Sequence, residues 1–485
     1  LMKILLDEAK LPWEQAWDLT VRTLAYTNHT LLPEALEKWP VDLFATLLPR
    51  YLEIIYEINR RFLDDVREKL HNDETRLAAV SLIEEGADKK VRMAHLAIVG
   101  THSTNGVAAI HSNLLRTKTM PEFAHIFPQR FRNITNGVTP RRWLKLANPP
   151  LAKLLTDAIG DSWIVNLYHL KRAEPLAQDP AFLDGFLAAK RAAKVRFVDW
   201  IRSTAGIELN PDTIFDCQIK RIHEYKRQLL NVLQIVIWYN RLRKDPKTPF
   251  PPRTYLFAGK AAPAYWLAKV IIKLITSVAR VVNSDSAVRD RLRVEFLPNY
   301  SCTLAEHLIP AADVSEQIST AGYEASGTSN MKFMMNGAIT IGTRDGATVE
   351  IAEEVGEENI FLFGLTADQV AANKGWYDPR WHYNHDPETR EALDMIFSGY
   401  FCKDEPGIFQ PIHDTLLTHG DHYMHLADLT DYVATQGRIA ALYRNRSDWA
   451  KMAALNVIRS CKFSSDRSIA EYAKYIWGAV PCPAD

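Results

Sequence analysis

The segment at 324–337, EASGTSNMKFMMNG, places a single lysine, Lys332, among apolar residues directly after a run of Ser, Gly and Thr. Such a run predicts a helix start, because Ser326 and Thr328 are residue types that cap free backbone amides, and Gly327 permits backbone angles that other residues avoid. Thr328 and Lys332 are four residues apart and therefore share one helix face. An anion held at the start of this helix would have an ammonium group beside it.

The setting of Lys332 indicates a specific chemistry. Asn336 and Gly337 predict the end of the helix, so the lysine lies on a short helix with apolar neighbours. An apolar setting lowers the pKa of a lysine, and an unprotonated amine condenses with aldehydes. Pyridoxal phosphate offers an aldehyde to such a lysine and a phosphate to the Ser-Gly-Thr run. The alternative is a structural lysine whose ammonium group reaches solvent, and the residues alone leave both interpretations open.

A second cluster, KRIHEYKRQLL at 220–230, contains four cations between a predicted strand and a predicted helix. Open α/β sheets place their ligands at such connections. Cations at the start of a helix oppose its dipole, so four of them are unfavourable unless an anion such as phosphate lies between them. The alternative is a solvated basic loop. The four residues are Lys220, Arg221, Lys226 and Arg227.

The elements that must position these clusters begin with amphipathic helical patterns over residues 1–135. The segment NGVTPRRWL at 136–144 then predicts a new helix, with Thr139 as its cap and Pro140 at its first position. We place a domain boundary there, which divides the chain into residues 1–135 and residues 136–485.

From residue 212 onward, short β-rich runs alternate with helical patterns, which predicts a parallel sheet. The strand candidates are TIFDCQI, TYLFAG, RVEFLP, AITIG, ATVEI and NIFLFG, with a turn at Asp345 and Gly346 between AITIG and ATVEI. The segment AGKAAP at 258–263 lacks the glycine spacing of a nucleotide-binding loop, so it predicts only a tight turn. Helical patterns return after residue 430.

Composition narrows the class of protein. With 485 residues and 47% hydrophobic content, the chain is expected to form two domains with large cores. Lys plus Arg and Asp plus Glu each total 58, so neither nucleic acid nor an acidic membrane surface is an expected partner. The five cysteines show no CxxC pairing, and no apolar run reaches the length of a membrane span. These features favour a soluble, cytoplasmic protein without a structural zinc site.

Five longer stretches carry a family resemblance: YTNHTLLPEALEKWP, TNGVTPRRW, QIKRIHEYKRQLLN, EASGTSNMKFMMNGAITIGTRDGATVEI and FSSDRSIAEYA. Nearly from end to end, the chain resembles the α-glucan phosphorylases that act on glycogen, starch or maltodextrin. The resemblance implies an α/β, GT-B-like architecture. Residues 1–135 would form the helical end of the N-terminal domain, and residues 136–485 a complete C-terminal Rossmann-like domain whose last helices cross back.

The same resemblance implies pyridoxal 5'-phosphate as cofactor and a retaining phosphorolysis. Inorganic phosphate would release terminal α-1,4-linked glucosyl units of an α-glucan as glucose 1-phosphate, and the complete enzyme would be a homodimer. Lys332 would bond the cofactor, and Arg221 and Lys226 would gather the substrate phosphate. Family positions near the cofactor correspond to Lys220, Gly327, Thr328, Trp143 and Tyr300. Sugar-binding positions correspond to His29, Asn136, Tyr225, Glu324, Ala325, Ser326 and Gly327, with the His29 carbonyl also stabilising positive charge on the sugar.

The sequence departs from the family pattern in three places. Ser301 stands where several members have arginine, so we expect one phosphate or cofactor contact to be weaker or supplied elsewhere, and Ser329 replaces a common glycine. The chain also begins at Leu1, inside the family's first domain. We therefore expect these 485 residues alone to be poorly soluble and nearly inactive.

Two other functions stay open. One is a noncatalytic fragment that binds glucan or cofactor. The other is a glycosyltransferase of the GT-B fold that uses a nucleotide sugar, although such an enzyme has no need of an aldehyde-binding lysine at position 332.

Overall fold

The computed structural model describes residues 1–482. These residues divide into two compact units. The first unit contains Leu1–Thr135 together with residues 468–482, and the second unit is Asn136–Arg467. The chain therefore leaves the first unit after residue 135 and returns to it after residue 467.

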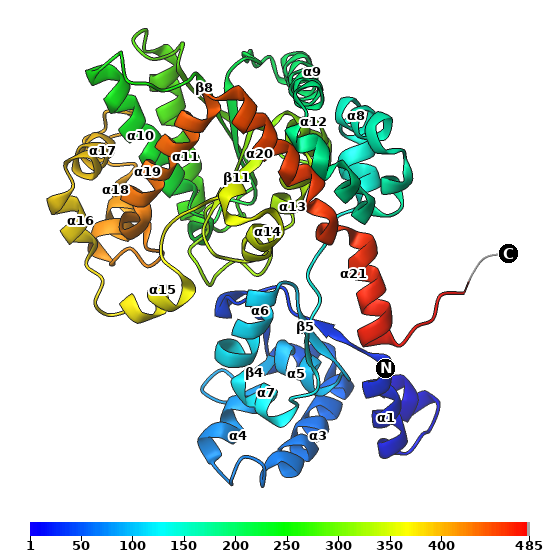
Figure 1. The fold of residues 1–485 in the computed structure, drawn as a ribbon. Helices are drawn as coiled ribbons and strands as arrows, with labels where there is room; N and C mark the ends of the chain where they lie inside the picture. Colours follow the sequence, from blue (N-terminus) through cyan, green and yellow to red (C-terminus); the bar gives the residue numbers. More distant parts are fainter. Residues whose placement is uncertain (483–485) are drawn as a thin grey trace. The chain divides into compact units, whose positions relative to one another are not determined.

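The first unit consists of helices and two small sheets (Figure 1). Its helices are α1 (Trp13–Thr23), α2 (Val41–Leu47), α3 (Pro49–Val66), α4 (Glu74–Val80), α5 (Met93–Val99), α6 (Ala109–Leu114) and α7 (Pro121–Ile126). A parallel sheet joins β1 (Tyr26–Thr27), β5 (Thr104–Gly106) and β6 (Phe131–Asn133). An antiparallel sheet joins β2 (Lys38–Pro40), β4 (Lys90–Arg92) and β3 (Ile83–Glu84). These strands of two or three residues are too short for a recognisable alternation in the sequence.

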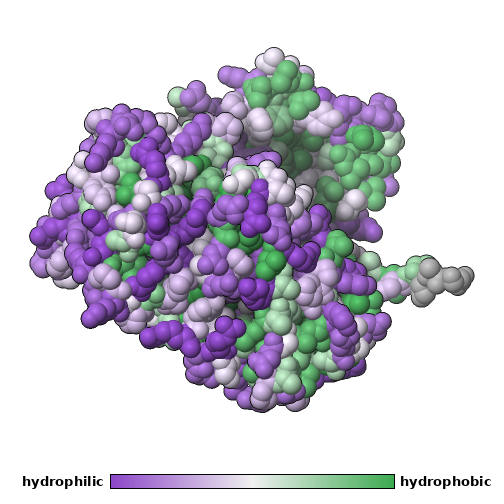
Figure 2. All heavy atoms as spheres, turned by 90° about the horizontal axis from the view of Figure 1, so that it is seen from above, coloured by the Kyte–Doolittle hydropathy of each residue, from purple (hydrophilic) through white to green (hydrophobic). Residues whose placement is uncertain are grey.

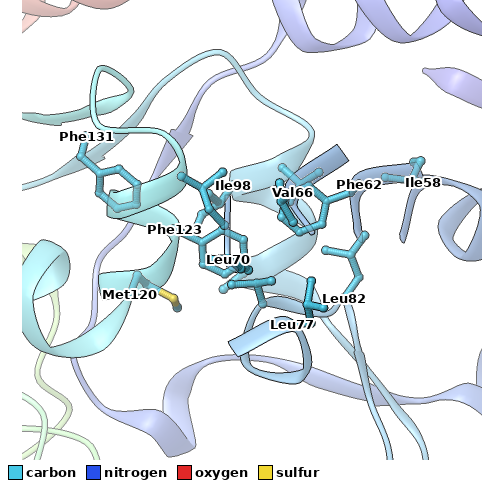
Figure 3. Packing of buried hydrophobic residues seen from close by; sticks show 14 of the residues in the cluster. Ile58, Phe62, Val66, Leu70, Leu77, Leu82, Ile98, Met120, Phe123 and Phe131 are labelled. Carbon is cyan, nitrogen blue, oxygen red and sulfur yellow. The ribbon is translucent and has the colours of Figure 1, made fainter. Parts of the chain in front are cut away.

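Helix α3 illustrates why this unit is mainly helical. Its residues Ile54, Ile58, Phe62 and Val66 recur every four positions and are all buried, as a helix with one apolar face requires. Figure 3 shows Ile58, Phe62 and Val66 turned toward the same cluster as Phe123. The rings of Phe62 and Phe123 stack with their centroids 6.1 Å apart.

The second unit is built on a six-stranded sheet, and the pairings between neighbouring strands in it are all parallel. In spatial order the strands are β12 (Phe361–Leu362), β11 (Ile339–Gly342), β10 (Val314–Gln317), β7 (Ile214–Ile219), β8 (Arg253–Ala258) and β9 (Leu292–Leu297). The predicted parallel α/β arrangement is therefore confirmed.

Helices cover this sheet (Figure 1). Helix α10 (Gln228–Lys244) packs on α11 (Trp266–Ser284), α17 (Pro387–Phe397) and α19 (His425–Tyr443). Helix α9 (Pro180–Ala205) packs on α8 (Pro149–Ile159), α12 (Cys302–Ala311) and α20 (Arg446–Ile458). The remaining helices of this unit are α13 (Ser329–Met335), α14 (Thr348–Val355), α15 (Ala367–Asn373), α16 (Pro379–His385) and α18 (Gln410–His413). Helix α21 (Ser465–Tyr472) begins in the second unit and continues into the first.

Two details of the sheet differ from the sequence-based prediction. ATVEI is not a strand but the start of α14, and Asp345 and Gly346 turn the chain into that helix instead of into a hairpin. The central strand β10 was not predicted, because its residues Ser315, Glu316 and Gln317 are polar although all three are buried. Side-chain hydrogen bonds compensate for that burial, and the sequence gives no sign of them.

The surface carries hydrophobic residues in separate patches between hydrophilic ones (Figure 2). Large exposed side chains include those of Trp376 and Trp266. None of the helices within residues 1–482 combines the length and the apolar character that crossing a membrane requires.

Candidate active site

The candidate site lies where the strand order of the sheet reverses. From β7 the chain runs outward through β8 to β9, then returns to place β10 on the other side of β7 and continues to β11 and β12. The connections that leave the carboxyl ends of β7 and β10 therefore meet across a crevice, the usual ligand site of such sheets. These connections are residues 220–227 and residues 318–328. The first contains the cationic cluster, and the second leads into α13, which carries Lys332.

Lys332 lies on α13, against an aromatic ring. Its Nζ is 4.1 Å from the centroid of the Trp143 ring, and Trp143 is buried. Burial lowers the pKa of Lys332, and the Arg142 guanidinium adds to this shift. Asn336 fixes the arrangement by donating hydrogen bonds from Nδ2 to the carbonyls of Trp143 (2.7 Å) and Lys332 (2.9 Å). The lysine is thus held in the partly apolar setting that favours its neutral amine.

The start of α13 differs in part from the prediction. The helix begins at Ser329 and ends before Asn336 and Gly337, as predicted, and Gly337 has φ +71°. However, Thr328 does not cap the helix with its side chain, and the Ser326 hydroxyl donates to the Gly327 carbonyl (2.9 Å). Within residues 1–482 the Thr328 hydroxyl has no hydrogen-bond partner, so it is available to a ligand. The helix after Thr139 begins at Pro140, as predicted, and the Trp143 amide donates to the Thr139 carbonyl (3.0 Å), but within residues 1–482 the Thr139 side chain makes no capping hydrogen bond.

Lys220 joins the two connections. Its Nζ donates to Oε1 of Gln317 (2.8 Å), and Nε2 of Gln317 donates to the hydroxyl of Ser329 (3.4 Å) at the first position of α13. Burial and the nearby Lys226 ammonium lower the pKa of Lys220 to about 7. A bound anion would stabilise the protonated form of this lysine.

Lys226 and Glu324 form an ion pair across the crevice. Their side chains are 15% and 20% exposed, and Nζ donates to Oε2 of Glu324. Although burial opposes it, the Glu324 carboxylate raises the pKa of Lys226, and Lys226 together with Lys220 lowers the pKa of Glu324. The Tyr225 ring lies 4.6 Å from the Lys226 ammonium. Arg221 is exposed and makes no ion pair within the part of the chain that the structure describes.

The sequence suggested that Arg227 is one of four cations around a single anion, but the structure places it elsewhere. Its side chain is fully buried and pairs with Asp428 at 2.6 Å. Lys226 is also neutralised, by Glu324, so part of the charge that the sequence assigned to an anion is balanced inside the protein. Lys220 and Arg221 remain as cations without a carboxylate partner in residues 1–482.

The other predicted site residues fall into two groups. Ala325 and Ser326 are buried on the connection after β10, and Tyr300 is partly exposed just before α12, with its pKa raised by burial. Asn136 begins the second unit, where its carbonyl accepts a hydrogen bond from Arg467 (3.1 Å). His29 belongs to the first unit and is exposed directly after β1.

Two residues near the site escaped the sequence analysis. Gln317 accepts the Lys220 hydrogen bond, and Asp345 accepts hydrogen bonds from the amides of Gly322 and Glu324 and from the Ser319 hydroxyl. Only their places in the chain could have indicated a role in the site, because Gln317 ends β10 and Asp345 closely follows β11.

Comparison with known proteins gives the family. The model of the carbohydrate phosphorylases matches residues 1–479. The chain belongs to the carbohydrate phosphorylase family. It is 51% identical over 483 residues to the muscle form of glycogen phosphorylase from Bos taurus, a match that covers 99% of this chain and 57% of that protein. The muscle form from Homo sapiens is 50% identical and the brain form from Ovis aries 51% identical, each over 482 residues with the same coverage.

This carbohydrate phosphorylase chain thus spans 57% of the length of the curated relatives it matches. Its departure at Ser301 has a structural role, because the Ser301 hydroxyl caps α12 by accepting a hydrogen bond from the Leu304 amide (3.3 Å). Its departure at Ser329 provides the hydroxyl that meets Gln317.

Proposed function

We propose that this chain supplies the cofactor-binding and phosphate-binding part of a glycogen phosphorylase. The reaction would be the phosphorolysis of terminal α-1,4-linked glucosyl units, with retention, to give glucose 1-phosphate. One observation supports it most: Lys332, Lys220 and the Lys226–Glu324 pair all follow the two strands at the switch point of the sheet. The identity to glycogen phosphorylases is consistent with the same reaction.

The residues present fit pyridoxal phosphate. Lys332 offers an amine of lowered pKa against the aromatic face of Trp143, and it would hold the cofactor through Nζ. Lys220 offers an ammonium group and Thr328 a free hydroxyl to a phosphate. When bound, the cofactor supplies a second phosphate, whose second pKa of roughly 6 lets it exchange a proton near neutral pH.

The chain's own residues would bind the substrate phosphate. The exposed Arg221 guanidinium offers two parallel donors to a phosphate. Lys226 stays protonated because Glu324 raises its pKa, so its ammonium group would donate hydrogen bonds to the phosphate although Glu324 balances its charge. Inorganic phosphate held in this way would protonate the leaving glycosidic oxygen and capture the sugar carbon from the same face, tasks that glycosidases give to two carboxylates.

The sugar would be bound by the connection after β10. Glu324 is kept ionised by Lys226 and Lys220, so it accepts hydrogen bonds from sugar hydroxyls. Ala325, Ser326 and Gly327 would contribute backbone groups. The roles of Tyr225, Asn136, Tyr300 and His29, the two-domain GT-B arrangement and the homodimer stay predictions from the resemblance.

The test is an assay of glucose 1-phosphate release from maltodextrin by the complete enzyme, with and without inorganic phosphate. We expect release to require phosphate and Arg221→Ala to raise the KM for phosphate by about a hundredfold, since a charge-assisted contact contributes a few kcal/mol. Borohydride reduction followed by peptide mapping should place a pyridoxyl group on Lys332. Transfer from a nucleotide sugar without phosphate, or a label on another lysine, would contradict the proposal.

A further inference from the structure

Arg227 has an unusual position next to the phosphate-binding Lys226. It is fully buried, and its backbone is in the left-handed region, with φ +57° and ψ +41°. A residue other than glycine keeps this conformation only where its surroundings compensate for the strain. The surroundings in this case are hydrogen bonds to two other segments of the chain.

The first segment is the connection that carries Glu324. Arg227 donates from Nε to the Ile318 carbonyl (2.7 Å) and from Nη2 to the Ser319 carbonyl (3.2 Å). The backbone adds one more link, because the Thr320 amide donates to the Tyr225 carbonyl (3.0 Å). Both connections at the switch point are therefore tied together by the two residues that flank Lys226 in the chain.

The second segment is Met424 together with the first turn of α19. Nη1 of Arg227 donates to the Met424 carbonyl (3.2 Å) and to Oδ2 of Asp428 (2.6 Å). The other oxygen of Asp428 accepts the amide of Leu365 (2.9 Å). The guanidinium is thereby fixed on both sides, and its charge is neutralised by a carboxylate that is 2% exposed.

We propose that Arg227 is a positioning residue that sets the place of Lys226 relative to Glu324. The inference rests on the proposed function. Arg227 does not touch the substrate phosphate, because its donors are directed to the carbonyls and to Asp428. Instead, it fixes the backbone from which Lys226 extends, and a displacement of that ammonium group by 1 Å or so is enough to weaken phosphate binding strongly.

Two variants test this role. Arg227→Lys keeps the positive charge beside Asp428, but a single ammonium group does not reproduce the fork that reaches Ile318 and Ser319. Asp428→Asn leaves these carbonyl contacts in place and removes only the neutralising carboxylate. Arg253→Lys is the matched control, because Arg253 is also fully buried and donates to Gln436 and Tyr255 on another part of the sheet.

The measurements are the KM for inorganic phosphate, the KM for maltodextrin, and the affinity for inorganic phosphate by titration calorimetry, which needs no turnover. For Arg227→Lys we expect phosphate KM and Kd to rise about tenfold or more, with the KM for maltodextrin changed less than threefold. Asp428→Asn should show a smaller shift in the same direction. The control should keep both KM values.

Three results would overturn the inference. The first is an unchanged affinity for phosphate in either variant that folds. The second is an equal rise of the KM for phosphate and the KM for maltodextrin, which a general loss of structure would produce. The third applies if Arg227→Lys fails to fold: an unchanged phosphate affinity in Asp428→Asn then overturns the inference. A wild-type protein that binds no inorganic phosphate would overturn the proposed function as well, and so the two failures are distinguishable.

Discussion

The ammonium group of Lys332 lies 4.1 Å above the centre of the Trp143 ring. The ring therefore protects the lysine from water on one side and attracts its charged form, an interaction of about 0.5–2 kcal/mol. Burial acts in the opposite direction and prevails, since the pKa of Lys332 is lowered. The lowered pKa makes the amine of Lys332 available to an aldehyde, while the contact with the Trp143 ring holds the side chain in place.

Replacing Trp143 tests that relationship. Trp143→Leu should weaken the retention of pyridoxal phosphate by about tenfold, because the aromatic surface beside Lys332 is lost. Trp143→Phe, which keeps an aromatic face, is the control. Cofactor absorbance after dialysis is the measurement. A leucine variant that holds the cofactor as the wild type does would show that the ring has no part in the site.

Because of Lys220, the protein is expected to take up a proton when it binds an anion. The lysine's pKa of about 7 means that the amine is largely neutral above neutral pH, and a bound phosphate raises that pKa. Phosphate affinity should therefore fall as pH rises from 7 to 9, with uptake of up to one proton per site. Calorimetry in two buffers of different ionisation enthalpy measures the uptake.

The control for this titration is Lys220→Met, which should show less proton uptake and a flatter pH dependence. Phosphate itself titrates in the same range, so the comparison is between the two proteins at each pH. An identical uptake in both would refute the assignment.

Because of His95, the free energy of unfolding of the first unit is expected to depend on pH. The Nδ1 of His95 donates to the Ser81 carbonyl (3.0 Å), its ring meets Phe123 edge to face, and burial lowers its pKa to about 4. The unfolded chain binds a proton near pH 6.5 and the folded chain near pH 4, so stability falls as pH drops through this window, by up to about 3 kcal/mol.

Urea unfolding at pH 7 and at pH 4.5 measures this effect. In His95→Gln the loss of stability between the two pH values should be smaller by about 2 kcal/mol. His125 is exposed on α7, and His125→Gln should leave the loss unchanged. The prediction is wrong if both variants respond to pH alike.

Gly259 is required by a close backbone approach. A Cβ at this position would lie 2.0 Å from the Lys220 carbonyl, which no side-chain movement relieves. Gly259→Ala should therefore lower the free energy of unfolding by about 1–3 kcal/mol and displace Lys220, with weaker phosphate binding. Gly437→Ala is the control, because a Cβ on that helix position meets only Trp238 at an ordinary 3.9 Å. Equal stability of the two variants would contradict this account.

The sequence predicts the outline of the second unit because its strands β7, β8, β9 and β11 are runs rich in β-branched, aromatic and other apolar residues, followed by helical patterns. It fails at β10, where polar residues are buried with side-chain partners distant in sequence. It also fails at ATVEI, whose β-branched residues favour a strand although the turn at Asp345 and Gly346 starts a helix.

The candidate site shows the same limit. Lys332 and the cations at 220–227 were found from local spacing alone. Local spacing does not show that Lys226 pairs with Glu324, about a hundred residues away in the chain. It also does not show that Arg227 leaves the cationic cluster to pair with Asp428, about two hundred residues away. Charge counting along a loop therefore overestimates the charge that is left for a ligand.

These long separations have a consequence for folding. Lys220 and Gln317 are 97 residues apart, Lys226 and Glu324 are 98 apart, and Arg227 and Asp428 are 201 apart. Contacts of this sequence separation close large loops, so they form late compared with hairpins and helices. During refolding, secondary structure and much of the core should therefore appear before the proposed phosphate site forms. The interval between the two would report the docking of α19 on the sheet.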